Sequence, residues 1–144
     1  MGRLIVDTSV LVAIERGRAK AHDYIAADDD PAIAAITGAE LLVGVERADA
    51  PRRADRSRLV EAILAEFPVE TYDLDVAREH ARLLAHTHRT GRPRRAFDLI
   101  IAATALARDR EVVTTDARGF ADLPGVRVRV GSPAADRGSA AVDL

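Results

Sequence analysis

Residues 3–16 of the chain, RLIVDTSVLVAIER, determine how the fold begins. The run 3–6 is short and apolar with two β-branched residues, which predicts a buried strand. Residues 7–9 (DTS) can cap a helix, and helical apolar spacing continues over 10–16. This stretch predicts a strand, a tight turn and a helix, with the acidic Asp7 at the point where the strand ends.

Strands and helices alternate along the rest of the chain. We expect further strands over 32–35, 69–72, 111–115 and 126–130, and helices over 19–27, 37–47, from 51 onward, 75–88 and 96–107. Alternation of this kind predicts an α/β fold with a mostly parallel central sheet flanked by helices on both faces. Ligands of such folds bind beyond the carboxyl ends of the strands, where the strand order reverses.

Length and composition predict one domain. The chain has 144 residues, of which 48% are hydrophobic, enough for a single core. We assign this domain to residues 1–130 and expect 131–144, rich in Ser, Pro, Ala, Gly and charge, to be a flexible tail. The absence of cysteine excludes disulfides, thiolate catalysis and sulfur-ligated zinc, so a metal would need oxygen or histidine ligands.

Charge and hydropathy restrict the surroundings and the partners. The first residues lack the apolar length of a signal peptide, and no later apolar run reaches the roughly 18 residues of a membrane span. We therefore expect a cytoplasmic protein that spans no membrane. The net charge is only -2, so any affinity for nucleic acid must come from local groups of basic residues.

Four acidic residues stand at positions where a site could form. Asp7 and Asp116 each follow a predicted strand, while Glu40 and Asp98 lie near the starts of predicted helices. Taken singly, each has a structural explanation: a cap or Asx turn for the two that follow strands, a capping box begun by Thr37 for Glu40, and the helix dipole for Asp98.

Together the four acids favour a metal site. Asp98 opens a helix that is apolar almost all round, where an acidic side chain is rarely buried without a partner. Carboxylates that converge repel one another and need either protons or a cation. Oxygen-only ligands suit Mg²⁺ or Mn²⁺.

Several strings resemble the PIN domain, and specifically the VapC-type toxins of bacterial toxin-antitoxin modules. They are LIVDTS (4–9), Glu40 followed by Gly44, DLIIAATA (98–105) and VVTTD (112–116). The resemblance spans residues 3 to 130 and implies a three-layer PIN-like fold. It also implies a magnesium- or manganese-dependent endoribonuclease that cuts structured RNA such as transfer or ribosomal RNA. Such toxins are usually dimeric, and a cognate VapB-like antitoxin inhibits them.

The resemblance also assigns roles to residues. It implies metal binding by Asp7, Glu40, Asp98 and Asp116, and supporting hydroxyl groups on Thr8, Ser9, Thr114 or Thr115. One departure is Phe97, where many relatives have Asn.

The expected chemistry is hydrolysis of a phosphodiester by a metal-activated water, which leaves a 5′-phosphate. The four histidines show no relation to the acidic motif, so we interpret them as surface residues. Arg92, Arg94 and Arg95 lead directly into the helix that bears Asp98, and we expect them to contact RNA phosphates. A second group, Arg52, Arg53, Arg56 and Arg58, is better explained as a solvated face.

Two other functions remain open from the residues alone. An aspartyl-phosphate phosphotransferase also places an Asp after its first parallel strand. Phosphatases of the haloacid dehalogenase type normally need a second Asp two residues later, where this chain has Ser9, and a lysine. Receiver domains likewise need a lysine near the phosphate, and the only lysine, Lys20, is poorly placed for it. A non-catalytic protein-binding module could use the acidic pocket to dock a partner's arginine.

Overall fold

The structure is a computed structural model and describes residues 1–131, in which strands and helices alternate. The elements are β1 (Arg3–Val6), α1 (Thr8–Glu15), β2 (Asp30–Ala34), α2 (Ala35–Arg47), α3 (Ala50–Glu66), β3 (Val69–Glu70), α4 (Leu74–Thr90), α5 (Ala96–Ala107), β4 (Glu111–Thr114) and β5 (Val128–Val130). Apart from Gly131, the predicted tail lies outside the described residues.

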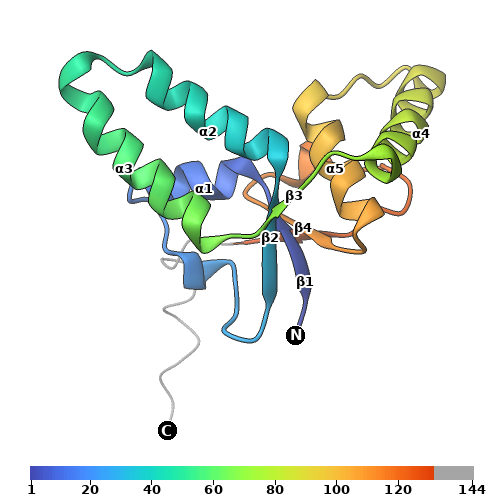
Figure 1. The fold of residues 1–144 in the computed structure, drawn as a ribbon. Coiled ribbons are helices and arrows are strands. Elements are labelled where there is room, and N and C mark those ends of the chain that lie inside the picture. Colours follow the sequence, from blue (N-terminus) through green and yellow to red (C-terminus); the bar gives the residue numbers. More distant parts are fainter. Residues whose placement is uncertain (132–144) are drawn as a thin grey trace, which may run out of the picture.

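The five strands form one parallel sheet in the order β3-β2-β1-β4-β5 (Figure 1). β1 lies at the centre, with β2 on one side and β4 on the other, so the order reverses beside β1. Val6 of β1 pairs with Val113 of β4. The strands that precede Asp7 and Asp116 are therefore neighbours in the sheet.

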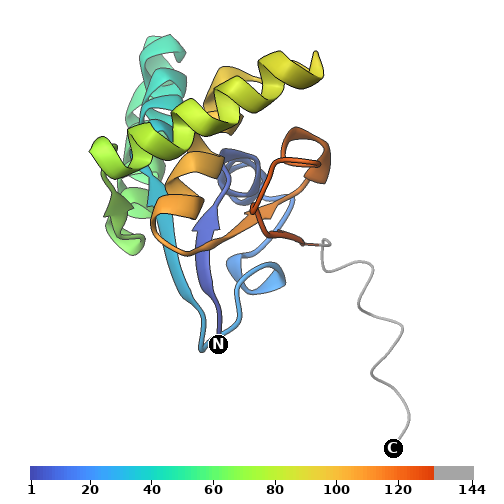
Figure 2. The ribbon, with the colours of Figure 1, turned by 90° about the vertical axis from the view of Figure 1, so that its right-hand side faces the viewer.

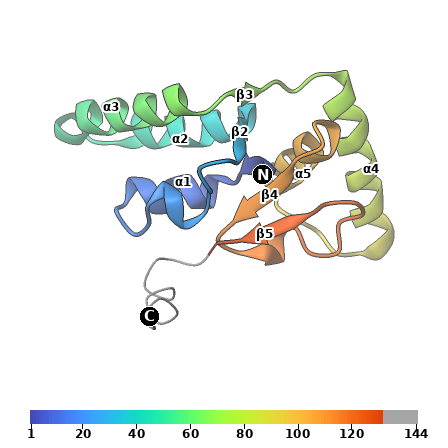
Figure 3. The same ribbon diagram turned by 90° about the horizontal axis from the view of Figure 1, so that it is seen from below.

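The central strands are buried on both faces, and helices cover each face. Along β1, Leu4 and Val6 pack with α1, α2 and α3, whereas Ile5 packs with α4 and α5. This alternation follows from the two-residue period of a strand. Figure 3 shows α2 and α3 on one side of the strands and α4 and α5 on the other. The predicted three-layer α/β architecture is confirmed.

Helix α5 is the most apolar helix of the fold, and it has the predicted bounds. Leu99, Ile101 and Ala103 are at most 2% exposed, because α5 lies between the sheet and α4 (Figure 2). Burial of a side chain the size of Leu99 or Ile101 contributes about 1.5–3 kcal/mol. Within residues 1–131 no helix is both long enough and apolar enough to span a membrane.

The predicted helix over 19–27 is wrong. This segment contains only a short 3-10 turn, Ala21–Asp23. The carboxylate of Asp29 instead accepts hydrogen bonds from the backbone N–H groups of Ala26 and Gly2, both at 2.8 Å. A side-chain acceptor that satisfies local amides competes with helix formation, and here it ties the segment to the start of β1.

The two strands at the edges of the sheet are short. β3 has two residues and β5 has three. In β5, Arg129 donates to Glu111 and to Asp29, both at 2.9 Å. These ion pairs fasten β5 to β4 and to the segment before β2.

Candidate active site

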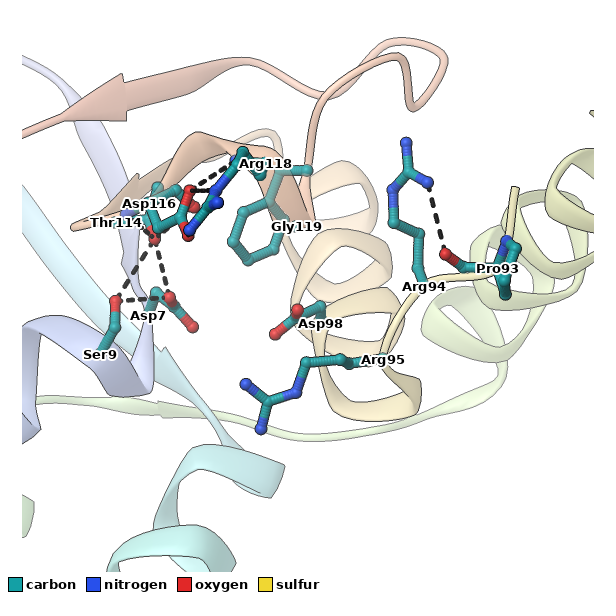
Figure 4. Close-up of a pocket in the computed structure, with 11 residues that line it drawn as sticks. Asp7, Ser9, Pro93, Arg94, Arg95, Asp98, Thr114, Asp116, Arg118 and Gly119 are labelled. Atoms are coloured by element: carbon teal, nitrogen blue, oxygen red, sulfur yellow. Dashed lines mark hydrogen bonds and ion pairs between the residues drawn. The ribbon is translucent and has the colours of Figure 1, made fainter.

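The four acidic residues lie along the carboxyl edge of the sheet. Asp7 follows β1, Asp116 follows β4, Glu40 lies on α2 and Asp98 lies in the first turn of α5. Two pockets adjoin there. One of about 430 Å³ is lined by Asp7, Asp98 and Asp116, and one of about 300 Å³ by Asp7, Glu40 and Asp98. Asp7 and Asp98 are therefore shared by both pockets, and Figure 4 shows them in the larger one.

Hydroxyl groups fix the orientation of Asp7. Its residue is 6% exposed, and its Oδ2 accepts hydrogen bonds from Ser9 Oγ at 2.6 Å and Thr114 Oγ1 at 2.8 Å. Asp7 occupies the N-cap position of α1 but makes no side-chain capping bond. The capping expectation for Asp7 is wrong because these hydroxyls hold the carboxylate toward the pocket (Figure 4).

Glu40 lines the smaller pocket from α2, a helix that begins earlier than predicted. The helix begins at Ala35 without a side-chain cap, so the capping box expected from Thr37 and Glu40 is absent. Thr37 is instead buried, and Thr8 Oγ1 donates to Glu40 Oε1 at 2.7 Å. Burial raises the pKa of Glu40, and the nearby Asp7 carboxylate raises it further.

Asp98 has the most perturbed carboxyl group of the site. Its pKa is raised to about 6, first by burial and then by the negative charge of Asp7, against the opposing charge of Arg95. The backbone of Gly119 lies directly against it, since a Cβ added there would stand 2.7 Å from Asp98 Oδ2. A carboxyl group whose pKa is shifted this far by burial and by a neighbouring charge is typical of a functional site.

Asp116 is held differently, by an arginine of its own turn. Arg118 donates from Nε to Asp116 Oδ1 at 2.9 Å and from Nη2 to Oδ2 at 2.6 Å. The backbone N–H of Arg118 also donates to Oδ1 at 3.0 Å, which confirms the predicted cap of this turn. The guanidinium is the main reason that the pKa of Asp116 falls to about 2.

The four carboxylates share one edge without forming a closed cage. In residues 1–131 no three acidic or histidine side chains stand close enough to hold a metal ion as they are placed. Glu40 is turned toward Thr8 and Asp116 toward Arg118. The donor set still fits a hard divalent cation, because it offers only oxygen ligands and because carboxylate repulsion contributes to the raised pKa of Asp98.

The three arginines expected to bind RNA have different surroundings. Arg95 lies beside Asp98 (Figure 4), and it lines both pockets. Arg94 donates from Nη2 to the carbonyl of Ala121 at 2.8 Å, which joins the segment before α5 to the loop after Asp116. Arg92 is exposed and pairs with Asp122.

Sequence reasoning missed two residues of the site, Thr37 and Arg118. Thr37 bonds to Thr8, but the capping-box pattern gave it a different role. Arg118 stands two residues after Asp116, a spacing that allows a side chain to fold back on its neighbour. Thr115, expected to support the site, lines the smaller pocket, and its backbone N–H donates to Ser9 Oγ at 3.2 Å.

Comparisons with known proteins agree with this geometry. The model of the PIN domain family matches residues 4–126. Ribonuclease VapC5 of Mycobacterium tuberculosis is 40% identical over 122 residues, 84% of this chain and 87% of that protein. The tRNA(fMet)-specific endonuclease VapC of Salmonella typhimurium is 34% identical over 96 residues, 67% of this chain and 71% of that protein.

A solved structure gives the same result. The crystal structure of VapBC-5, a toxin-antitoxin system of Mycobacterium tuberculosis, matches with a TM-score of 0.69 at 34% identity, over 90% of this chain and 98% of that chain. The chain therefore belongs to the PIN domain family, among its VapC-type members.

Proposed function

We propose that this protein is a divalent-metal-dependent endoribonuclease that acts as the toxin of a toxin-antitoxin pair. The observation that carries the proposal is the meeting of Asp7, Glu40 and Asp98 at one edge of the sheet, with the pKa of Asp98 raised to about 6. A fold gains no stability from such a carboxyl group, which suggests a role in chemistry. The relatives named ribonuclease and endonuclease support the same activity.

We assign the cation, Mg²⁺ or Mn²⁺, to Asp7, Glu40, Asp98 and Asp116. When bound, the cation would screen the charge of the phosphodiester and lower the pKa of the attacking water. The protein's own hydroxyls orient the carboxylates: Ser9 and Thr114 hold Asp7, and Thr8 holds Glu40. Because the contacts to Asp7 exist before substrate arrives, little reorganisation of that carboxylate is left for the reaction itself.

We propose structured RNA as the substrate, held by its backbone. Arg95 lies at the pocket wall and can contact a phosphate directly, while Arg94 and Arg92 extend the basic surface toward the loop at 121–123. The chain has only 3% aromatic residues, so stacking on bases contributes little. Recognition would then depend on RNA shape and phosphate position, in the cytoplasm where such RNA is found.

We expect an antitoxin to inhibit the enzyme through the acidic pocket. Structures similar to this chain are described as VapBC toxin-antitoxin systems. A partner arginine placed among the carboxylates would neutralise part of their charge by bidentate hydrogen bonds. Inhibition of this kind should weaken as manganese is raised, because the cation competes for the same oxygens.

The direct test is cleavage of total RNA by purified protein, with Mn²⁺ or with EDTA, followed by mapping of the RNA ends. We expect Mn²⁺-dependent cleavage that leaves 5′-phosphates, and loss of cleavage in Asp7→Asn and in Asp98→Asn. Arg127→Gln is the matched control, since Arg127 pairs with Asp109 at the far end of β4. Undiminished cleavage by either acid variant, or cleavage in EDTA, would contradict the proposal.

The phosphotransferase alternative is less favoured by the site. Such an enzyme needs a lysine near the phosphate, and Lys20 does not line either pocket of the described acidic edge. A non-catalytic docking module would bind a partner through the same acids but would show no metal-dependent cleavage. The RNA assay therefore separates all three functions.

A further inference from the structure

The ion pair between Arg118 and Asp116 uses both oxygens of that carboxylate. Oδ1 accepts from the Nε and the backbone N–H of Arg118, and Oδ2 accepts from Nη2 and from Nε. The Arg118 side chain is 91% exposed and otherwise extends into solvent at the mouth of the larger pocket. Figure 4 shows its guanidinium folded back over Asp116, on the side of the pocket opposite Asp98 and Arg95.

This arrangement conflicts with metal binding by the same carboxylate. An oxygen that accepts two N–H donors has little remaining capacity to bind a cation, and a guanidinium beside it repels that cation. The described acidic side chains do not form a closed metal cage as they stand, and Asp116 is one of those turned away. Some side chain must therefore move before the four acids can act together.

We propose that Arg118 is an internal competitor of the divalent cation for Asp116. Without the cation, the guanidinium occupies the carboxylate and reduces the negative charge of the pocket. Binding of the cation releases Arg118, whose charge then stands free at the pocket mouth, where an anionic phosphodiester would enter. This inference rests on the proposed function. Under it, the Arg118 guanidinium becomes available to bind a phosphate only after the metal has bound.

The competition predicts a specific change in metal affinity, measured without RNA. Titration of the full-length protein with Mn²⁺ in a calorimeter should show about fivefold tighter binding by Arg118→Gln than by the wild type, the factor expected from loss of one exposed ion pair. Arg118→Lys keeps the charge but loses the bidentate geometry, so its affinity should fall between the two. Arg127→Gln, which removes a distant arginine, should bind Mn²⁺ as the wild type does.

A double-mutant cycle separates competition from a general effect of charge. In an Asp116→Asn background the guanidinium has no carboxylate to occupy, so adding Arg118→Gln should change Mn²⁺ affinity less than twofold, well under the fivefold expected for the intact pair. If Arg118→Gln raised Mn²⁺ affinity equally with Asp116 and with Asn at that position, the competition would be overturned. The effect would then come from the positive charge of Arg118 alone. Unchanged or weaker binding by Arg118→Gln would overturn the competition as well.

A spectroscopic measurement reports the release directly. In a spectrum of arginine Nε–H groups, the Arg118 signal, assigned by its loss in Arg118→Gln, should move toward the position of a free arginine as Mg²⁺ is added. The Arg127 signal should stay in place. A stationary Arg118 signal at saturating Mg²⁺ would overturn the inference while leaving the proposed nuclease intact, whereas failure of every variant to bind Mn²⁺ or Mg²⁺ would overturn both.

Discussion

Asp98 shows how a single residue can favour function over stability. Its carboxyl group is half-buried near Asp7, and it lies so close to the backbone of Gly119 that a side chain at that position would clash with it. Its pKa in the folded chain, about 6, lies above the ordinary value of 3.8. The proton is therefore held more tightly in the folded state than in the unfolded state, and ionisation of Asp98 destabilises the fold.

Replacement of Asp98 by Asn should therefore stabilise the metal-free protein at neutral pH while abolishing cleavage. The wild type loses the contribution of Asp98 to stability as pH rises from about 4 through 6, and the variant lacks this loss, since Asn carries no proton to lose. After allowance for solvent screening, we expect a gain of about 1 kcal/mol in the free energy of unfolding at neutral pH. Urea unfolding in EDTA measures it.

The control for this prediction is the same pair of proteins at low pH. Near pH 4 both side chains are uncharged in the folded state, so the two free energies of unfolding should coincide within about 0.5 kcal/mol. The prediction would be contradicted if Asp98→Asn were less stable than the wild type at neutral pH. The ionised carboxylate of Asp98 would then make a stabilising contact that Asn cannot replace.

Arg95 and Arg94 should differ in their effect on RNA binding, although they are neighbours in sequence. Arg95 lines both acidic pockets, so Arg95→Gln should weaken RNA binding and reduce its salt slope by about 1. Arg94 bonds to the carbonyl of Ala121, so Arg94→Gln should lower stability as well as binding. Binding measured over a salt series, with thermal unfolding of each variant, tests both. An unchanged salt slope in Arg95→Gln would assign Arg95 to a protein partner.

Among the elements, α5 has two tasks, since it fills the core and presents Asp98. The Ile101→Ala substitution should cost about 2–5 kcal/mol of unfolding free energy, because Ile101 is 1% exposed and leaves a cavity between the sheet and α4. Phe97 lies on the same helix and is 45% exposed, so Phe97→Ala should cost about 1 kcal/mol or less. Equal losses in the two variants, measured by urea unfolding, would contradict the buried placement of α5.

Sequence reasoning succeeded for the elements whose pattern is set by burial. The apolar run 96–107 predicted a buried helix and forms one. That the acids after β1 and β4 share one edge could be predicted only on the condition, met in the structure, that the two strands are neighbours. It failed for the segment 19–27, where the carboxylate of Asp29 accepts from the nearby amide of Ala26 and from that of Gly2, which is distant in sequence. The ion pair between Arg118 and Asp116 could not be predicted either, since it depends on the directions that both side chains take after the end of β4.

At the scale of the whole molecule, a cation bound at the site should stabilise the folded chain. Because Mn²⁺ would bind the folded state and neutralise repelling carboxylates, saturating Mn²⁺ should raise the melting temperature by a few degrees, and EDTA should reverse it. The increase should be larger near pH 7.5 than near pH 5, since a pKa of about 6 leaves Asp98 mostly protonated at the lower pH. Differential scanning fluorimetry measures it. An equal increase at both pH values would assign binding to the other acids.

The short edge strands of the sheet bear on how this molecule can meet other chains. β3 offers two residues of open main chain, and β5 offers three, with Arg129 in its middle. An extended segment adds to a sheet by pairing along several consecutive amides, and within residues 1–131 neither edge strand is long enough to template such an addition. A chain released from its inhibitor would therefore have little tendency toward amyloid-like association, and a partner would gain its affinity from helical faces and side-chain pockets.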